Sequence, residues 1–424
     1  MRKELEIEEK YRIIVRLAKM LHKYGTSSFR VEAYVTEVVQ HWGLNCDILD
    51  SPTSLSFSFS DGNHDGKALL IRSKPGEINL GALSKVTKLI YRILEDKYDL
   101  SEITERLDAI ESEKPYYSNF VEFLSFALGS GGFSLLYDSN WVTCFISVFL
   151  GGVVYLLWKY AMNHNFMIGM FEILSTFVSA VLACVLSLYF PELSIPIAIL
   201  SAVIVYVPGL SISLALEELS SRGLLAGTAR LMDAFVVMIK LIVGALVGVQ
   251  LMEKLLEIPH TYTIDPVTPL TKGLAIVLLS FCIAVLFNVQ KREVIFGVIS
   301  GSIAYLCSYM LGQYIGEIPA IFVASMLVGI YSCLLGGWRD VPTLVYIVQG
   351  IIIMVPGSRS YIGITDFYFN QPTTPSDNMG QSALFMFAAI LGGLIISNSI
   401  FTMDNLKRIQ RFRDRFLHRR TISS

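Results

Sequence analysis

Charged residues are scarce in this sequence. Only 17% of its 424 residues are Asp, Glu, Lys or Arg, whereas a soluble globular domain carries about 25%. The six cysteines are scattered, with spacing that matches neither a metal site nor a disulfide framework. The sequence also lacks a nucleophile–base set, a metal motif and a nucleotide-binding loop. A membrane enzyme is therefore the least favoured class, and we expect no cofactor, no metal and no nucleic-acid partner.

Apolar residues are abundant and come in long runs. Hydrophobic residues make up 53% of the chain, and the mean hydropathy is +0.55. The charges crowd the N-terminal quarter and the C-terminal tail. Between them lie apolar runs of about 18–25 residues, long enough to cross a hydrocarbon core of about 30 Å. The sequence therefore predicts an α-helical polytopic membrane protein with a soluble N-terminal domain.

Residues 1–117 are predicted to form this soluble α+β domain. Leu55, Phe57 and Phe59 alternate with serines, which is typical of a strand with one buried face. Helical spacing of apolar residues favours helices before and after the strands. In chain order we expect helices at 6–24 and 26–42, strands at Cys46–Leu49, Ser54–Ser60 and Lys67–Arg72, and helices at Leu80–Asp96 and Leu100–Ile110.

The remaining chain divides into ten candidate membrane spans, five on either side of a polar loop. The first repeat covers residues 118–255, the connecting loop 256–270, the second repeat 271–403 and a basic tail 404–424. The spans are expected at 119–137, 141–160, 166–189, 194–213, 231–252, 271–289, 294–313, 319–337, 341–357 and 381–402. Because each half has an odd number of spans, the second half enters the bilayer from the opposite side. The predicted fold is thus a 5+5 inverted repeat, a topology associated with alternating access in transporters.

Lys and Arg in the loops predict the orientation of the chain. With the N-terminal domain inside, the inner loops and the tail hold most of the basic residues, as the positive-inside rule requires. Both termini are then cytoplasmic in a multi-pass protein of the cell membrane, either plasma or bacterial inner membrane. We interpret the basic tail as a topology anchor on the anionic headgroups of the lipid bilayer rather than as a site of lipid regulation.

Two Pro-Gly pairs interrupt apolar spans at matching positions of the two halves. Pro208-Gly209 lies near the end of the fourth span, and Pro356-Gly357, followed by Ser358, ends the ninth. A broken helix in each half is typical of a transporter substrate site, because backbone N–H groups freed at the break can hold a carboxylate. A simple proline kink is the structural alternative. We expect all five residues to bind substrate, with the first break toward the cytoplasm and the second toward the outside.

Ionisable residues are few within the spans, where each costs roughly 2.5–3.5 kcal/mol at a helix centre. Asp233, Lys240, Gly244 and Gly248 share one face of the fifth span, so the two charges are expected to face the bundle. Glu172 in the third span can pair with Lys240 or carry a proton. We expect Lys240 to bind substrate, and Glu172 and Asp233 to serve in proton coupling or as ion-pair partners. Buried structural ion pairs are the alternative.

Four further polar residues lie near the ends of spans. Glu217, Glu218 and Arg222 are interpreted as a solvated cytoplasmic loop. Asn398 in the tenth span either lines a polar path or bonds a neighbouring helix. We include Asn398 among the substrate-binding candidates.

Several motifs are specific enough to compare with known families. They are Val207-Pro208-Gly209-Leu210-Ser211-Ile212 with Glu217, Gly223, Gly227 and Arg230, then Gly25-Thr26-Ser27-Ser28-Phe29-Arg30-Val31-Glu32, Pro52-Thr53-Ser54, Gly76-Glu77-Ile78-Asn79-Leu80, Arg339-Asp340-Val341-Pro342 and Val355-Pro356-Gly357-Ser358. Over nearly the whole chain these resemble signatures of the threonine/serine exporter family in its fused two-module form. The resemblance implies secondary export of small amino acids or, as in split two-component relatives, of C4-dicarboxylates such as succinate, coupled to protons. The resemblance assigns no catalytic residues to this chain.

One function and two alternatives follow. The first is a secondary active exporter, an antiporter of threonine/serine-like amino acids that works by alternating access at the interface of the two repeats. The second exports C4-dicarboxylates. The third is a membrane-anchored sensor or scaffold in which residues 1–117 bind a partner; intramembrane charges and broken helices would be superfluous for it. The sequence leaves the physiological substrate, the coupling ion and a homo-oligomeric state open.

Overall fold

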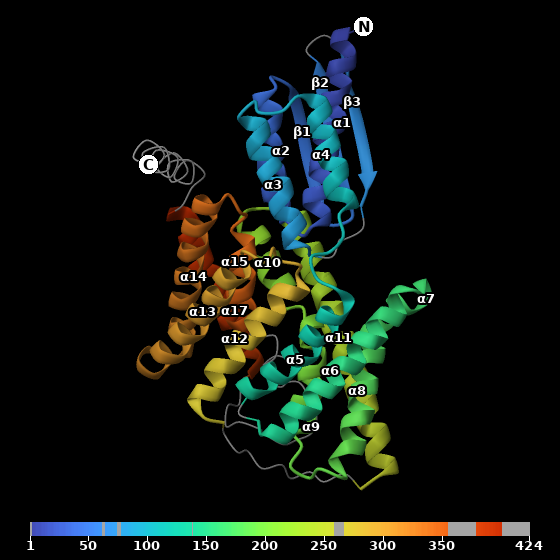
Figure 1. The fold of residues 1–424 in the computed structure, drawn as a ribbon, viewed down its shortest axis with the longest axis vertical. Helices are drawn as coiled ribbons and strands as arrows, with labels where there is room; N and C mark the ends of the chain where they lie inside the picture. Colours follow the sequence, from blue (N-terminus) through green and yellow to red (C-terminus); the bar gives the residue numbers. More distant parts are fainter. Residues whose placement is uncertain are drawn as a thin grey trace.

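The computed structural model describes residues 2–61, 64–73, 78–137, 139–257, 267–354 and 379–400. Figure 1 shows a mixed N-terminal unit (residues 2–112) resting on one end of a bundle of helices. The predicted substrate-binding residues Pro356, Gly357 and Ser358 and the basic tail 404–424 lie outside the described residues.

The N-terminal unit is a three-stranded antiparallel sheet packed against helices. Strand order is β1-β2-β3, and Phe57 of β2 pairs with Ile48 on one side and Leu69 on the other. As predicted, Leu55, Phe57 and Phe59 are buried on one face of β2, where they join Leu17 of α1 in the core. The elements are α1 (Arg2–Lys23), α2 (Ser28–His41), β1 (Asn45–Ser51), β2 (Ser54–Asp61), β3 (His64–Arg72), α3 (Leu80–Leu94) and α4 (Leu100–Ser112).

The bundle is built from apolar helices. In the first half these are α5 (Asn119–Leu136), α6 (Trp141–Met162), the one-turn α7 (Asn165–Ile168), α8 (Phe171–Ser187), α9 (Ile195–Val203), the 3₁₀ turn η1 (Ile204–Tyr206), α10 (Gly209–Ser220) and α11 (Leu224–Leu255). In the second half they are α12 (Pro269–Leu286), α13 (Val294–Ile315), α14 (Glu317–Arg339), α15 (Leu344–Met354) and α17 (Met379–Ile400).

Not every expected span is a long helix. Within the described ranges, six helices (α5, α6, α11, α12, α13 and α14) are long and apolar enough to cross a membrane, or seven if the bent pair α9–α10 counts as one span. Three shorter apolar helices occupy other expected positions: α8, α15 and Leu384–Ile400 within α17. The chain is thus a mainly helical multi-pass membrane protein.

The N-terminal unit and the segment that follows it bond to the residues at the end of α12. The Leu80 N–H donates to the Phe287 carbonyl at 3.0 Å, and the Tyr116 N–H donates to Asn288 Oδ1 at 2.8 Å. Asn288 lies two residues after the last residue of α12 and has a φ of 52°, a left-handed conformation that Asn tolerates well. α5 begins two residues after Tyr117, so α5 runs away from the N-terminal unit whereas α12 runs toward it.

Small residues bring α11 onto α8 and α17 onto α14. At each contact, a carbonyl and a hydroxyl of the neighbouring helix occupy the space that a Cβ on the glycine would need. This close approach is the usual way in which helices associate where lipid removes the hydrophobic driving force. The contacts are Gly244 with Ile173 and Thr176 for α11 on α8, and Gly393 with Phe322 and Ser325 for α17 on α14.

Candidate functional site

The fourth apolar segment is broken where its Pro-Gly pair predicts. α9 ends at Val203, a 3₁₀ turn follows, and α10 starts at Gly209 with its axis bent by 51° from that of the preceding segment. Pro208 cannot donate a backbone hydrogen bond, and its ring hinders continuation of the helix. The Gly209 N–H instead donates to the Val207 carbonyl at 2.8 Å. The predicted break at Pro208-Gly209 is confirmed.

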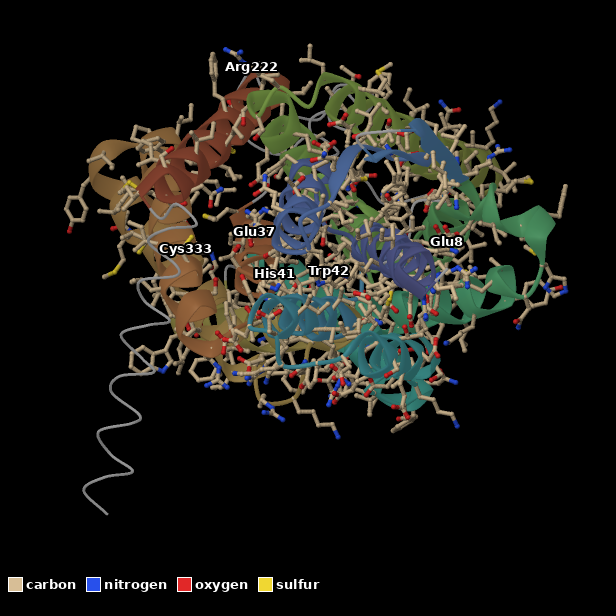
Figure 2. All side chains as sticks on the ribbon, turned by 90° about the horizontal axis from the view of Figure 1, so that it is seen from above. Glu8, Glu37, His41, Trp42, Arg222 and Cys333 are labelled. Atoms are coloured by element: carbon tan, nitrogen blue, oxygen red, sulfur yellow. The ribbon has the colours of Figure 1, made fainter. Side chains whose placement is uncertain are left out.

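Behind this break, α10 carries two adjacent carboxylates into the interior. Glu218 is fully buried and Glu217 is 7% exposed. Their interpretation as part of a solvated loop is wrong, because the N-terminal unit covers this end of the bundle. Arg222, two residues past α10, is exposed at a φ of 64° and lies at the edge of the bundle in the view along its axis (Figure 2). Only the third residue of the predicted loop is therefore solvated.

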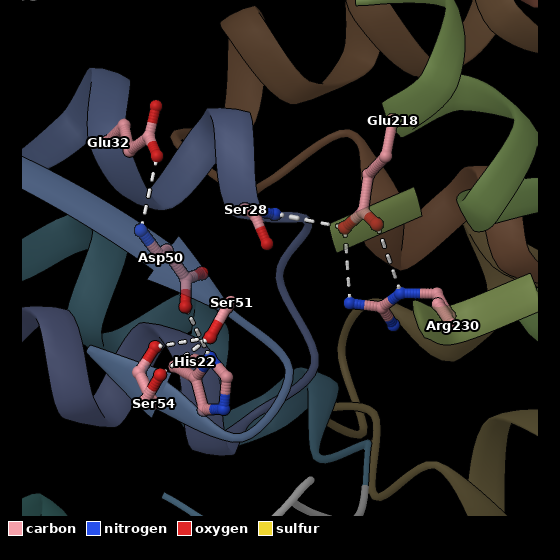
Figure 3. Close-up of polar contacts among 8 residues, drawn as sticks. All are labelled: His22, Ser28, Glu32, Asp50, Ser51, Ser54, Glu218 and Arg230. Carbon is pink, nitrogen blue, oxygen red and sulfur yellow. Dashed lines mark hydrogen bonds and ion pairs between the residues drawn. The ribbon is translucent and has the colours of Figure 1, made fainter. Parts of the chain in front are cut away.

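Glu218 binds an arginine and a helix N-terminus at once (Figure 3). Arg230 of α11 donates from Nη2 to Oε1 at 3.2 Å and from Nε to Oε2 at 3.4 Å. The Ser28 N–H, in the first turn of α2, donates to Oε1 at 3.1 Å. Because the first N–H groups of a helix carry partial positive charge, the carboxylate faces positive charge on both sides.

Glu217 connects three parts of the chain. Arg30 of α2 donates from Nη2 to Glu217 Oε1 at 3.2 Å, and Asn398 of α17 donates from Nδ2 to the same oxygen at 3.3 Å. Arg30 also donates from Nη1 to Thr343, the residue before α15, at 2.7 Å. Burial alone would lower the pKa of the Arg30 guanidinium, but the charge and hydrogen bond of Glu217, together with the nearby Tyr34 and Cys333, outweigh burial and raise that pKa. We call Arg30, Glu217, Glu218, Arg230 and Asn398 the junction cluster.

Gly227 in α11 makes the contact between Arg230 and Glu218 possible. A Cβ at residue 227 would meet the Ala215 carbonyl and the Leu219 side chain, so only glycine lets α11 cross α10 this closely. Arg230 lies three residues later, on the same face of α11, and thereby reaches Glu218. The motif spacing from Glu217 to Arg230 thus has a direct structural reason.

A second buried carboxylate lies in the second half of the bundle. Glu293, the residue before α13, is 2% exposed. Arg339 donates to it from Nε at 2.7 Å and from Nη2 at 2.8 Å, and the Tyr346 hydroxyl donates at 2.6 Å. The sequence did not single out Glu293, and only its position next to the basic pair 291–292 at a span end could have drawn attention to it.

The predicted partners Glu172 and Lys240 are adjacent. Lys240 Nζ lies 3.4 Å from Glu172 Oε2, and the two side chains are 28% and 20% exposed. Gly244, one turn further along α11, packs against Thr176 of α8. The structure therefore confirms the pairing that the sequence predicts; whether the pair binds substrate or carries protons stays a prediction.

Asp233 does not face the bundle as expected. Its side chain is exposed and forms no ion pair with the residues that the structure describes. α11 runs parallel to α8, since Gly244 meets Thr176 and the next turn, Gly248, meets Ala180. Asp233 lies seven residues before Lys240, beyond the point where α8 begins. It shares the face of Lys240, but no part of α8 covers it there.

Comparison with known sequences places these features in a family. The family model for threonine/serine exporters matches residues 12–252, and a second model, Threonine/Serine exporter, matches residues 272–400. No solved structure gives a significant match.

Curated relatives are distant and most are longer than this chain. A probable threonine/serine exporter of Mycobacterium tuberculosis is 22% identical over 87% of this chain and 72% of the relative. An uncharacterized Schizosaccharomyces pombe protein is 22% identical over 76% of this chain and 44% of the relative. A Yarrowia lipolytica protein named pheromone-regulated membrane protein 10 is 23% identical over 83% of this chain and 30% of the relative. The chain thus spans less than half the length of both fungal relatives.

Proposed function

Since the chain belongs to the threonine/serine exporter family of membrane transporters, we propose that it is a secondary active exporter of small, threonine/serine-like amino acids driven by the proton gradient. One observation carries the proposal. The broken helix of the first half is bonded through Glu217 to Asn398 on the last described helix of the second half. A break at the contact between two halves is where transporters of repeat architecture bind substrate.

An inverted relation between the halves is supported by helix direction. α5 runs away from the N-terminal unit, and α12, its counterpart, runs toward it. The fourth elements are also opposed: α10 ends beside Ser28, whereas α15 begins beside Arg30. These four directions are the ones expected of two five-span repeats that cross the membrane in opposite senses.

The register of helix contacts supports the same relation. Gly393 follows Gly244 by 149 residues, and both glycines contact the helix at the third expected span of their half, α14 and α8. Ser325 follows Thr176 by the same interval, and each hydroxyl side chain lies against its glycine. An equal spacing on two helices at once favours a shared ancestry of the halves. By this relation, α15 runs away from the N-terminal unit, opposite to α10.

The proposed substrate path combines the two Pro-Gly pairs with the Glu172–Lys240 pair. Pro208-Gly209 lines the inward half of the path and Pro356-Gly357, with Ser358, the outward half. The substrate carboxylate meets the broken ends or the Lys240 ammonium, and Glu172 carries the coupling proton. The N-terminal unit and the basic tail face the cytoplasm of a plasma or inner membrane.

Flux measurements in proteoliposomes test this proposal. Purified protein is reconstituted around labelled threonine, and efflux is followed with and without an imposed pH gradient, in competition with serine or succinate. We expect gradient-dependent threonine efflux that serine slows and succinate leaves unchanged. Succinate flux without threonine flux would mean that the chain exports C4-dicarboxylates instead of amino acids. If no candidate moves in response to the gradient, a sensor or scaffold role replaces export.

A further inference from the structure

A buried amide in α15 has no hydrogen-bond partner. Gln349 is fully buried, and neither its Oε1 nor its Nε2 bonds to any of the residues that the structure describes. α15 is enclosed by α10, α12, α13 and α14. Leaving an amide unpaired in an apolar interior destabilises a protein, so such a group calls for a physical reason.

Two serines on helices that contact α15 do not share this state. Ser300 of α13 donates to the Tyr346 carbonyl at 2.8 Å, and Ser325 of α14 donates to the Phe322 carbonyl at 2.9 Å. Serines in helices commonly satisfy themselves in this way. Gln349 has a longer side chain with two N–H donors and one oxygen acceptor at its tip. None of these groups has a hydrogen-bond partner among the described residues.

A second unpaired group lies about one helical turn away. The Gln349 amide packs on Gly297 of α13, and Gly301, the next turn of the same helix, packs on the Ser280 side chain of α12. Ser280 Oγ is buried and has no partner among the described residues. The amide and the hydroxyl therefore lie against adjacent turns of one face of α13, and successive turns of a helix are about 5.4 Å apart.

We propose that Gln349 and Ser280 bind the zwitterionic head of an amino acid within the second half of the bundle. The Nε2–H group donates to the substrate carboxylate, Oε1 accepts from the substrate ammonium, and the Ser280 hydroxyl bonds the carboxylate from the adjacent turn. A zwitterion has no net charge, so uncharged partners suffice. This inference rests on the proposed function and replaces the broken ends and Lys240 by Gln349 and Ser280 as the partners of the substrate carboxylate.

The pair also distinguishes between substrate classes. An ionised C4-dicarboxylate offers only hydrogen-bond acceptors, so it can use Nε2–H but leaves Oε1 unpaired. An α-amino acid satisfies both ends of the amide. A site with an unused acceptor rejects the ligand that cannot donate to it, because the acceptor then stays buried without a partner. The chemistry of Gln349 therefore favours amino acids over dicarboxylates.

Substitution by an apolar residue of similar length provides the test. We compare Gln349→Met and Ser280→Ala with wild type, and use Gln250→Met, at an exposed position of α11, as the matched control. Two quantities are measured for each protein in detergent or proteoliposomes: the Tm with and without threonine, and the KM for threonine flux.

We expect Gln349→Met to raise the Tm of the ligand-free protein, because it removes two unpaired buried groups, while it raises the KM about tenfold and abolishes the threonine-induced rise in Tm. Ser280→Ala should raise the KM about threefold, and Gln250→Met should change nothing. An unchanged KM and an unchanged threonine-induced Tm rise in both variants would overturn the site, as would a lower Tm with unchanged KM. If wild type is stabilised by threonine through Gln349 but shows no flux, the site stands and the exporter proposal fails.

Discussion

The Ser28 N–H donates to Glu218 Oε1 at 3.1 Å, joining the first turn of α2 to the end of α10. Ser27, the N-cap residue of α2, makes no side-chain capping bond of its own. A capping acceptor satisfies one of the free N–H groups at a helix start, and here that acceptor comes from a broken helix of the bundle. The N-terminal unit is therefore tied to the element that carries Pro208-Gly209.

Loss of the Glu218 charge should loosen this junction. Glu218→Gln keeps an oxygen for the Ser28 N–H but leaves Arg230 without its counter-charge. Removing one partner of a buried ion pair costs about 3 kcal/mol or more, so we expect a Tm lower by several degrees and faster proteolysis between residues 112 and 119. The control Glu253→Gln changes an exposed carboxylate of α11 and should leave both unchanged. Equal Tm values for Glu218→Gln and wild type would show that the junction adds no stability.

The Glu172–Lys240 pair should be required for export. Lys240→Ala and Glu172→Gln each remove one partner of a contact that is 3.4 Å long and lies at a close crossing of α8 and α11. We expect both variants to reach the membrane in normal amounts and to export no threonine. Lys254→Ala, at an exposed position near the end of α11, is the control and should export normally. Normal export from both pair variants would reduce Glu172 and Lys240 to a structural contact.

Equivalent glycines should respond alike to an added methyl group. Gly244→Ala and Gly393→Ala both force a Cβ against a carbonyl and a hydroxyl of the facing helix, and overpacking of this kind costs about 1–3 kcal/mol. We expect a similar fall in Tm for the two variants. Gly273→Ala, where a Cβ meets open space, should leave the Tm unchanged or slightly raise it. A fall for one glycine alone would argue against matching packing in the two halves.

The Cys46 thiol should react slowly below pH 10. Burial in β1, with the Asp47 charge beside it, raises the pKa of this thiol to about 11. Only the thiolate is alkylated, so the iodoacetamide rate should be roughly tenfold below that of the unfolded chain at pH 8 and should still rise between pH 9 and pH 10. Peptide mass spectrometry after timed alkylation measures this rate. A plateau by pH 9 would mean that Cys46 titrates as a free cysteine does.

Periodicity and helix breakers predict most of the local structure. Apolar runs gave the helix positions, alternating serines gave β2, and Pro208-Gly209 gave the break, because each signal acts within a few residues. The pairing of Glu172 with Lys240 was also predictable, since an intramembrane charge needs a partner and the spans offered few.

The sequence could not predict which side chains are buried by elements that are distant in the chain. Glu217 looks solvated on its own helix, yet its partners Arg30 and Asn398 lie 187 and 181 residues away. The prediction that Asp233 is covered by the bundle was wrong for the opposite reason. Its helical face was predicted correctly, but the facing helix α8 begins too late to cover it. Burial at such positions depends on where neighbouring elements begin and end, and no local pattern encodes that.

Cysteine accessibility at the two breaks tests the central claim most directly. Gly209→Cys and Gly357→Cys are made singly in a chain without its native cysteines, and each is labelled with a membrane-impermeant maleimide from either side of sealed vesicles. The account predicts that residue 209 reacts from the side of the N-terminal unit and residue 357 from the opposite side, with threonine slowing both. Labelling of both positions from the same side would contradict the inverted arrangement and the substrate path built on it.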